Sequence, residues 1–533
     1  MASTRPLPPG VAAATLDRAL LRLARIVGDD ALLTCGEALW EFRDPYTFAG
    51  WERYLPSAVV QPSTVGQVQD VVRVAGELGV PLWTTSQGRN NGYGGSAPRV
   101  SGSVVVNLRR MNRVLEVSEA HAYAVVEPGV SFFDLYEAVR GAGHRLWIST
   151  PDLGWGSVVG NTLDHGFGFT VNGDHVGAQC GMEVVLADGS LLRTGMGAME
   201  GNRAWHVHKR GFGPSADGLF MQSNFGIVTK MGVWLMPEPE AYRAGWIRTK
   251  RHEDLGPIVD ALRPLVLDRT INGYPTVWYA QAFAAMRSVR SDWYTGEGPL
   301  PESVFAAMVD EYGIGRWNVR VPITGRREVV DAQWRAVERA AASIPGAWTE
   351  CRLYPGDVRP EEVDAGDQVP AGIPGLHLLE RLKWFGGVGG HVGFSPIAPL
   401  TGANAVELDG LVRTALAERG LDYNAAFILN PRAIVLTALM FFDTGNEEQA
   451  QAAFDVCRHL VREAARRGFG EYRAHLDFMD LVAEQYDFGD HAQRRFNERL
   501  KGALDPKGIL SPGKQGIWPG GSRPTPGAPA PIG

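Results

Sequence analysis

The order of apolar and polar positions first predicts a helix and then a β–α–β unit. The helix has apolar residues at helical spacing, namely Leu16, Leu20, Leu23, Ile26 and Val27. Gly28 follows them and can end the helix. Residues 57–62 form an apolar run typical of a strand. Thr64 and Gln67 have the spacing of a capping box, so a second helix should begin there, end at Gly79 and lead into a strand at 80–85.

Short strands continue after this unit. Apolar runs at 103–108 and 122–129 predict two strands, and Ser131 is placed to begin a short helix. The dipeptide Asp188-Gly189 lies between two β-rich runs, which indicates a hairpin within 183–195.

From about residue 240 strands and long helices alternate. Strands are predicted at 317–325, 347–355, 394–399, 426–430 and 433–442, and helices at 326–344, 404–420 and 447–468. Two β–α–β segments with a returning strand favour an α+β domain with an antiparallel sheet. Residues 470–519 are rich in turn residues and are predicted to return to the first domain. The expected division is therefore 1–240, 241–468 and 469–518, followed by a disordered tail at 519–533.

Composition limits the class of protein. The 533 residues are 45% apolar and 21% charged, with a net charge of −7, which is ordinary for a globular protein and argues against a nucleic-acid partner. The four cysteines lack C-x-x-C spacing, and His206 and His208 have no third ligand near them in sequence, so we expect no metal site. No signal core or membrane-length apolar run is present, and we expect a cytoplasmic protein without a membrane partner.

The stretch SQGRNNGYGG, residues 86–95, is unusual for a plain connector. Its four glycines permit positive φ and close approach of backbone amides, which is typical of a phosphate-binding loop. Gly92, Gly94 and Ala97 fit the dinucleotide fingerprint G-x-G-x-x-A, but Pro98 prevents the helix that this fingerprint needs. No acidic residue follows at the ribose-binding spacing either. The pattern therefore favours a phosphate-binding loop of another design.

Several longer stretches resemble one family. They are SQGRNNGYGGSAPRVSGSVVVNL, VEPGV, PDLGWGSVVGNTL, NGDHVGAQCGMEVVLADGSLLRTGMG, GFSPIAP, GEYRAHLDFMD and SPGKQGIWP. In this order, from about Ala58 to Pro519, they are similar to the vanillyl-alcohol oxidase family of flavoproteins, and within it to eugenol oxidase and the bacterial 4-alkylphenol oxidases.

The resemblance implies an α+β, two-domain FAD-binding fold of the PCMH/VAO type. In that fold an FAD domain is split around a substrate cap with an antiparallel sheet. The loop at 86–95 would then hold the FAD pyrophosphate. The implied cofactor contacts are Ser86, Gly88, Arg89, Asn90, Asn91, Gly92, Glu127, Pro128, Gly129, Ser157, Gly160, Asn161, Cys180, Gly181, Gly226, Ile227, His391, Arg473 and Lys514.

His391 stands in GGVGGHVGFSPI. A histidine in a glycine-rich loop is more often a structural hydrogen-bonding group than a reactive one. The resemblance instead implies that His391 attaches the flavin covalently through its 8α-methyl group, as in the family's oxidases. The related cresol methylhydroxylases use a tyrosine for this bond, so His391 favours an oxidase.

The resemblance assigns the substrate chemistry to four residues. Tyr93, Tyr472 and Arg473 match the family's phenolate-binding residues, and two hydroxyl donors with a guanidinium would favour the ionised phenol. Asp152 matches the acid near flavin N5, with proposed roles in charge balance and in accepting a proton from attacking water. A surface or core ion pair for Arg473 and a turn-forming role for Asp152 are the structural alternatives.

Two positions of the expected site depart from the family pattern. Phe169 stands where the family's oxidases commonly have tyrosine, and Asn172 stands where they have another aromatic residue. A buried hydroxyl that loses its partner is worth about 1–3 kcal/mol. We therefore expect the activity to remain and the substrate range to shift toward longer or less hydroxylated side chains.

The resemblance implies an FAD-dependent oxidase of para-substituted phenols. Hydride transfer to flavin N5 would give a para-quinone methide, and O₂ would be reduced to H₂O₂. Three alternatives remain open: a cresol-type dehydrogenase that passes electrons to a cytochrome, a non-redox transferase like the ether-lipid synthases, and a non-catalytic flavin-binding protein. The expected partners are a small phenol and O₂, in a homodimer or higher homo-oligomer.

Overall fold

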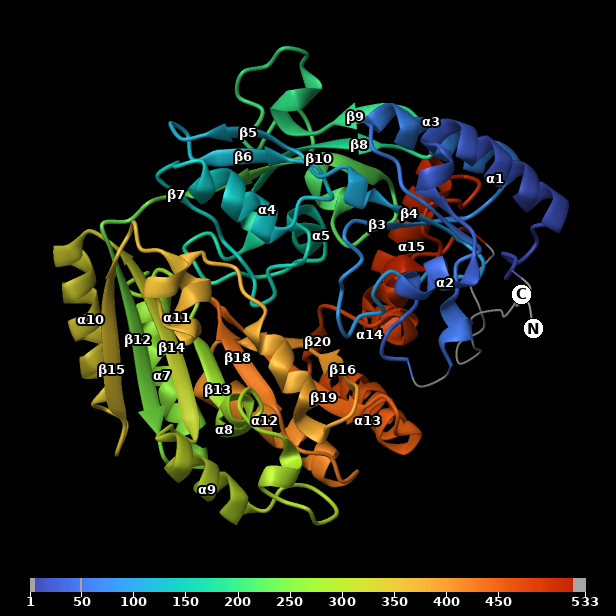
Figure 1. Cartoon of the computed structure of the whole chain (residues 1–533). Helices are drawn as coiled ribbons and strands as arrows, with labels where there is room; N and C mark the ends of the chain where they lie inside the picture. Colours follow the sequence, from blue (N-terminus) through green and yellow to red (C-terminus); the bar gives the residue numbers. More distant parts are fainter. Residues whose placement is uncertain (1–4, 48–49, 521–533) are drawn as a thin grey trace.

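The computed structural model describes residues 5–47 and 50–520. The N-terminal half and the red C-terminal helices lie together, and the segment between them forms a second lobe built on one large sheet (Figure 1). The predicted tail at 519–533 lies outside the described residues from position 521 onward.

The first sheet is small and lies near the N-terminus. Its strands are β1 (Leu32–Leu33), β2 (Ala58–Val60), β4 (Val104–Asn107) and β3 (Leu82–Thr85), in this spatial order. Strands β2 and β3 both pair with β4 in parallel, as a β–α–β unit requires, and β1 is antiparallel to β2. Helices α1 (Ala13–Val27) and α3 (Val65–Leu78) pack together. Their apolar residues form one core with this sheet.

The capping box predicted for α3 forms only in part. The Thr64 hydroxyl accepts a hydrogen bond from the Gln67 backbone N–H at 3.2 Å. The Gln67 side chain accepts its reciprocal bond from Ser63 N–H at 2.8 Å, not from Thr64. The helix still begins where the sequence predicts, because its N-terminal donors are satisfied from within the same turn. Gly79 ends it in the left-handed region, as expected.

The second sheet is antiparallel. Its spatial order is β5 (Val114–Ser118), β6 (Tyr123–Val126), β10 (Ile227–Trp234), β8 (Gln179–Val185) and β9 (Leu191–Arg193). The hairpin predicted at Asp188-Gly189 is confirmed by the pairing of β8 with β9. Three short helices lie in this part of the chain, namely α4 (Phe132–Tyr136), α5 (Val158–Leu163) and α6 (His175–Ala178). Ser131 caps α4 in a complete capping box.

The third sheet dominates the second lobe and is antiparallel throughout. Its main path runs through β15 (Trp348–Pro355), β12 (Ala241–Thr249), β14 (Trp317–Gly325), β13 (Thr276–Tyr279), β18 (Ala425–Leu429), β19 (Ala433–Asp443), β17 (Pro396–Pro399) and β20 (Gly470–Glu471). Strand β16 (Gly389–Phe394) also pairs with β19. The sheet thus runs two residues past position 469, where the sequence places the return to the first domain.

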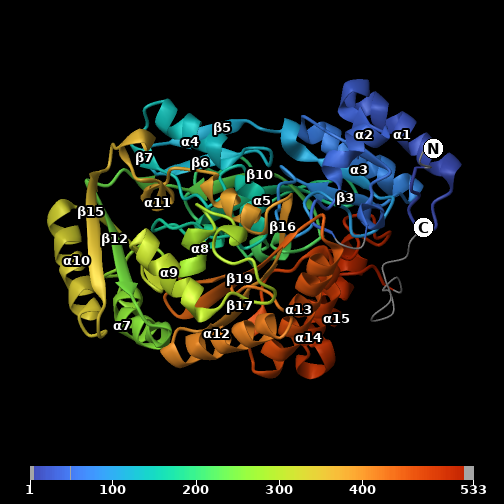
Figure 2. The same cartoon turned by 60° about the horizontal axis from the view of Figure 1, so that its bottom comes forward.

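Long helices cover one face of this sheet (Figures 1 and 2). They are α7 (Leu255–Leu267), α10 (Arg327–Ala341), α12 (Gly402–Ala417) and α13 (Glu447–Arg466), and their buried residues share one core with the strands. Other helices and short strands of the described residues before position 469 are α2 (Gly36–Leu39), β7 (Leu146–Trp147), β11 (Met236–Pro237), α8 (Ala280–Ala284), α9 (Glu302–Tyr312) and α11 (Ala365–Gln368).

The C-terminal stretch is more helical than its turn-rich sequence predicts. It contains α14 (Met479–Gln485) and α15 (Phe488–Leu504). The prediction of turns alone was wrong here because α15 is mostly polar and exposed, with only a few apolar residues such as Phe496 and Leu500 at helical spacing. The chain then reaches the edge of the first sheet, where Ser511 N–H donates to the Leu82 carbonyl at 2.8 Å. This contact brings the C-terminal segment beside the glycine-rich loop.

Candidate active site

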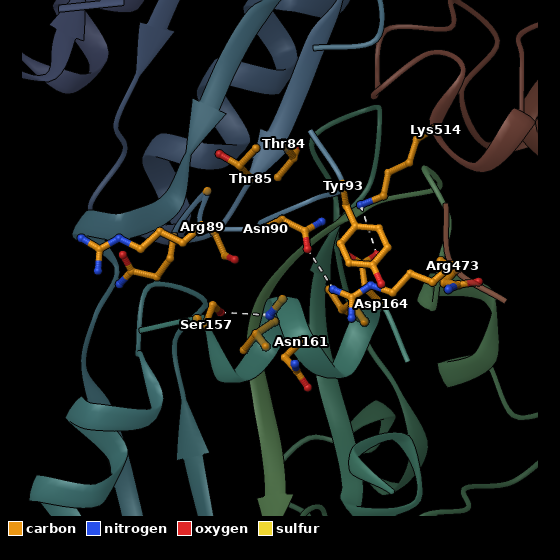
Figure 3. A pocket seen from close by; sticks show the side chains of 18 of the residues that line it. Thr84, Thr85, Arg89, Asn90, Tyr93, Ser157, Asn161, Asp164, Arg473 and Lys514 are labelled. Atoms are coloured by element: carbon orange, nitrogen blue, oxygen red, sulfur yellow. Dashed lines mark hydrogen bonds and ion pairs between the residues drawn. The ribbon is translucent and has the colours of Figure 1, made fainter. Parts of the chain in front are cut away.

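A single large cavity collects residues from distant parts of the chain. Its lining comes from the loop after β3, from α5, from the C-terminal segment and from strands β18 and β19 of the large sheet. Ile428 is the cavity-lining residue of β18, and Thr437 is that of β19. Figure 3 shows the side of the cavity where the loop, α5 and the C-terminal segment meet.

The glycine-rich loop wraps one side of the cavity. Gly88, Gly92 and Gly94 have φ of +71°, +73° and +104°, which favours glycine. Added side chains would also collide, since a Cβ at Gly88 would lie 1.8 Å from the Ser96 hydroxyl oxygen. Backbone and side-chain polar groups of the loop therefore reach the cavity. The cavity-lining residues of this loop that the sequence predicts are Ser86, Gly88, Arg89, Asn90 and Asn91.

Helix α5 forms the facing wall of this part of the cavity. The Ser157 hydroxyl accepts a hydrogen bond from Gly160 N–H at 2.9 Å and donates to the Pro128 carbonyl at 2.6 Å (Figure 3). Gly160 lets the helix approach the loop, because a Cβ there would lie 2.4 Å from the Ser86 hydroxyl oxygen. The Asn161 amide oxygen lies 2.6 Å from Nδ1 of His175. Burial lowers the pKa of His175 to about 4, so a neutral imidazole orients this amide.

Most of the cofactor contacts implied by the resemblance lie at the cavity. Besides the loop residues, the lining contains Pro128, Ser157, Gly160, Asn161, Gly226, Ile227, His391, Arg473 and Lys514. Five others do not line it within the described chain: Gly92, Glu127, Gly129, Cys180 and Gly181. The Glu127 carboxylate pairs instead with Arg113 at 2.7 Å. The Cys180 thiol donates to the Trp205 carbonyl at 3.6 Å.

His391 lies on strand β16, whereas the sequence places it in a loop. Its backbone pairs across the sheet with Phe441 on β19. This strand pairing fixes the position of His391. A Cβ at Gly92 would lie 2.5 Å from Nε2 of His391, so the missing side chain of Gly92 leaves room for the imidazole. Burial, together with Arg381 and His475, lowers the pKa of His391 to about 3. The imidazole is therefore neutral and has a free ring lone pair.

Tyr93, Tyr472 and Arg473 converge at one end of the cavity. The Arg473 guanidinium lies 4.3 Å from the Tyr93 ring centroid, and its Nη2 donates to the Asn90 amide oxygen at 2.9 Å (Figure 3). Burial raises the pKa of both tyrosines, so they are hydroxyl donors. Burial opposes the charge on Arg473, but the neighbouring phenols and Asp164 raise its pKa. Two neutral donors and one fixed cation thus lie together in the cavity lining.

Asp152 and Phe169 line another part of the same cavity. Asp152 is an ion-pair partner of Arg320, with Oδ1 3.5 Å from Nη2, and its side chain is 22% exposed. Phe169 is 3% exposed, and the Arg320 guanidinium lies 4.4 Å from its ring centroid. Asn172 points elsewhere, since its amide donates to the Leu235 carbonyl at 3.0 Å.

The sequence alone did not single out several residues of the cavity. Asp164 lies 3.9 Å from Lys514 and lines the cavity beside Arg473 (Figure 3). Gln222 donates to the Tyr472 carbonyl at 2.8 Å, and the Phe167 ring lies edge-on to Tyr472 at 6.0 Å. These residues belong to no motif, and only their place in the fold identifies them.

The polar groups at the cavity suit a flavin dinucleotide. Asn91 Nδ2 and Trp155 Nε1 are buried donors without a hydrogen-bond partner, and both residues line the cavity. Donors of this kind beside a positive-φ glycine loop match the acceptor oxygens of a pyrophosphate. Within the described residues no group of three or more His, Cys, Asp or Glu could hold a metal ion.

Two domain families match the chain and agree with this fit. Residues 56–195 match the FAD binding domain, and residues 387–515 match the FAD linked oxidases, C-terminal domain. The fold and the cavity thus define an FAD-linked oxidoreductase.

Relatives that match over nearly their full length show to which family of FAD-linked oxidoreductases the chain belongs. The chain is 35% identical to the 4-cresol dehydrogenase [hydroxylating] flavoprotein subunit of Pseudomonas putida, over 96% of this chain and 97% of that protein. The structure of 4-ethylphenol oxidase from Gulosibacter chungangensis superposes with a TM-score of 0.92 at 40% identity, covering 97% of this chain and all of the other. That of p-cresol methylhydroxylase with substrate bound gives 0.91 at 34% identity, covering 96% and 99%. The chain belongs to the vanillyl-alcohol oxidase family of PCMH-type FAD-binding flavoproteins.

No helix in the described part of the chain is long and apolar enough to span a bilayer.

Proposed function

We propose that this protein is an FAD-dependent oxidase of para-substituted phenols, including 4-alkylphenols, allylphenols and vanillyl-type benzylic alcohols. The observation that carries the proposal is the convergence of Tyr93, Tyr472 and Arg473 at one end of the cavity. The similar proteins described above act on 4-cresol and 4-ethylphenol by their names, which supports the same substrate class.

The chain's own residues would bind and orient the phenol. The hydroxyls of Tyr93 and Tyr472 donate to the phenolic oxygen, and Arg473 supplies a fixed positive charge that favours the anion. Asn90 holds that guanidinium through its 2.9 Å hydrogen bond, so the clamp is ordered before substrate arrives. The ionised oxygen pushes electron density through the ring and weakens the benzylic C–H bond toward hydride loss.

FAD, held by the glycine-rich loop, α5 and Lys514, would supply the two-electron oxidation of the substrate, with O₂ as the final acceptor and H₂O₂ as the product. The substrate that remains is a para-quinone methide. Water can add to its benzylic carbon to give an alcohol, or a proton can leave the neighbouring carbon to give an alkenylphenol. The Asp152 carboxylate lines the cavity and would accept the proton in either case.

We also propose that His391 binds the flavin covalently. Its imidazole is neutral and buried, and the strand holds it against the space beside Gly92. A neutral ring nitrogen is the nucleophile that such a bond requires. A cytoplasmic location and a homodimer or higher homo-oligomer stay predictions from the sequence.

The second candidate is a dehydrogenase that passes electrons to a cytochrome instead of O₂. The similarity to a 4-cresol dehydrogenase over nearly the whole chain favours keeping it. His391 supports the oxidase, since the sequence pattern associates histidine with that branch.

An anaerobic titration tests the proposal. The purified holoenzyme is mixed with 4-ethylphenol, 4-cresol, vanillyl alcohol and benzyl alcohol, and the flavin absorbance is followed. We expect bleaching with the three para-substituted phenols and none with benzyl alcohol, which lacks the phenolic oxygen. Admitting air should then restore the yellow form within a turnover and release H₂O₂. Bleaching without rapid reoxidation would support the dehydrogenase, and no bleaching by any phenol would refute both.

A further inference from the structure

Two buried arginines of the cap lobe lie behind Asp152. We propose that Arg320 and Arg381 are positioning residues that hold the Asp152 carboxylate in its place at the cavity, an inference that rests on the proposed function. Neither arginine belongs to the motifs that identify the family in this sequence. Arg320 comes from the middle of β14, and Arg381 from the short helical segment His377–Phe385.

The strand register places Arg320 on the cavity side of the large sheet. Arg320 is paired with Thr276 on β13, and Thr276 is paired with Ile428 on β18. Directly paired residues of neighbouring strands project from the same face of a sheet. Ile428 lines the cavity, so Arg320 projects from that face two strands away. From there its guanidinium reaches Asp152 across the boundary between the lobes.

More positive than negative charge lies around Asp152. Arg320 is 5% exposed and Arg381 is 8% exposed, and both interact electrostatically with His377, which also interacts with Asp152. Burial lowers the pKa of His377, so this side chain adds no charge near neutrality. Asp152 also interacts with Arg381 and opposes the effect of burial on that arginine, whose pKa falls to about 10. One carboxylate therefore lies at ion-pair distance from Arg320 and interacts electrostatically with Arg381.

A second carboxylate of the cap lobe, that of Asp367, already has hydrogen-bond partners of its own. The Asp367 carboxylate accepts hydrogen bonds from Trp246 at 2.9 Å, from Tyr354 at 3.1 Å and from Arg352 at 3.2 Å. The two cavity-side arginines instead keep unused donors. Arg320 Nε and Nη2 and Arg381 Nε are buried without a hydrogen-bond partner, as is Asp152 Oδ1. Because an unpaired buried charge is costly, the attraction of both cations keeps Asp152 beside them.

Aromatic rings fix the two guanidinium groups. Arg320 lies 4.4 Å from the Phe169 ring centroid and 5.9 Å from that of Trp278, and Arg381 lies 5.1 Å from Trp278. Such contacts are strongest where water is excluded. Phe169 offers its ring face to Arg320.

A double-mutant cycle tests the inference on the holoenzyme. Arg320→Leu and Arg381→Leu are made in the wild-type background and in Asp152→Asn. The rate of anaerobic flavin reduction by 4-ethylphenol and the Kd of phenol, which has no benzylic carbon, are measured for each. In the wild-type background we expect reduction to slow by about 10- to 100-fold, because small displacements of a reacting group cost this much. The Kd of phenol should change less than about 3-fold, since the clamp of Tyr93, Tyr472 and Arg473 is untouched.

The Asp152→Asn background distinguishes positioning from general structural damage. There the arginine changes should add little further loss, because residues that act through one group are non-additive. Arg320→Lys keeps the charge and should recover part of the rate, and it serves where the leucine variant does not fold. Arg248→Leu is the matched control, because Arg248 is a largely buried arginine of the same sheet that stacks on Trp246.

Two results would overturn the inference. One is an equal loss of rate from the arginine changes with and without the Asp152 carboxylate. The other is an equal loss in Arg248→Leu. Wild-type protein that no para-substituted phenol reduces would remove the proposed function as well, whereas a reducible wild type with additive losses would remove the positioning role alone.

Discussion

Replacing Gly92 by alanine should interfere with flavin attachment by displacing His391. A Cβ at position 92 would lie 2.5 Å from Nε2 and 2.8 Å from Cδ2 of the imidazole. Carbon atoms and their neighbours normally stay about 3.5 Å apart or more. The ring must therefore move by about 1 Å, since strand β16 and its pairing with Phe441 limit the other ways to relieve the overlap.

The expected effect has two parts of different size. Gly92 has φ of +73°, so alanine there should cost about 1–2 kcal/mol of stability from backbone strain alone. Displacing a reacting atom by about 1 Å costs about 100-fold in rate. Gly92→Ala should therefore fold and bind FAD, but form the covalent bond about 100 times more slowly than the wild type.

Gly79→Ala separates strain from steric overlap. Gly79 has φ of +68° at the end of α3, and a Cβ there meets nothing within 4 Å. Both variants should lose similar thermal stability, but only Gly92→Ala should release yellow flavin into the supernatant after acid precipitation. The reasoning fails if Gly92→Ala retains covalent flavin at the wild-type rate, or if both variants lose it equally.

Four further substitutions test the rest of the site. His391→Ala should release all flavin on acid precipitation, and a colourless wild-type pellet would refute the covalent bond itself. Tyr472→Phe and Arg473→Ala should each slow flavin reduction by 4-ethylphenol by about 10-fold or more and weaken binding of ionised phenolic inhibitors, because each removes a charge-stabilising group; unchanged rates in stopped flow would contradict the clamp. Phe169→Tyr should shift the ratio of kcat/KM several-fold, about 1 kcal/mol, toward vanillyl alcohol over 4-ethylphenol. A constant ratio in air-saturated assays would show that Phe169 does not set the preference.

Apolar periodicity predicted the elements that bury a continuous face. The strand at 317–325 coincides with β14, and the helix at 326–344 contains α10, because strongly patterned segments pack against the core that their pattern implies. Helix α15 was missed since its sequence carries mostly polar residues. The half-formed capping box at Thr64 shows a related limit, because the Gln67 side chain accepts from the neighbouring Ser63 N–H instead of from Thr64 N–H.

The site was predictable to the extent that it lies in motifs. Tyr93, Tyr472, Arg473 and His391 stand in stretches that resemble the family, and the structure places all of them at one cavity. Arg320 could not be found this way. It lies 168 positions beyond Asp152, in a strand whose sequence indicates only β-structure, and its contact with Asp152 depends on how the two lobes meet. The role of Gly92 as a spacer for His391 depends on the same kind of long-range contact.

The two lobes contribute different groups to the cavity. The proposed phenol-binding end is built from Tyr93 and Asn90 of the glycine-rich loop and from Tyr472 and Arg473 after β20, joined by the hydrogen bond from Arg473 to Asn90. The acid at the reacting end, Asp152, is held from the cap sheet. Recognition of the phenolic oxygen and control of the benzylic carbon therefore depend on different elements. Substitutions in β14 or its neighbours should change which side chains react, and with what product, while the requirement for a phenol persists.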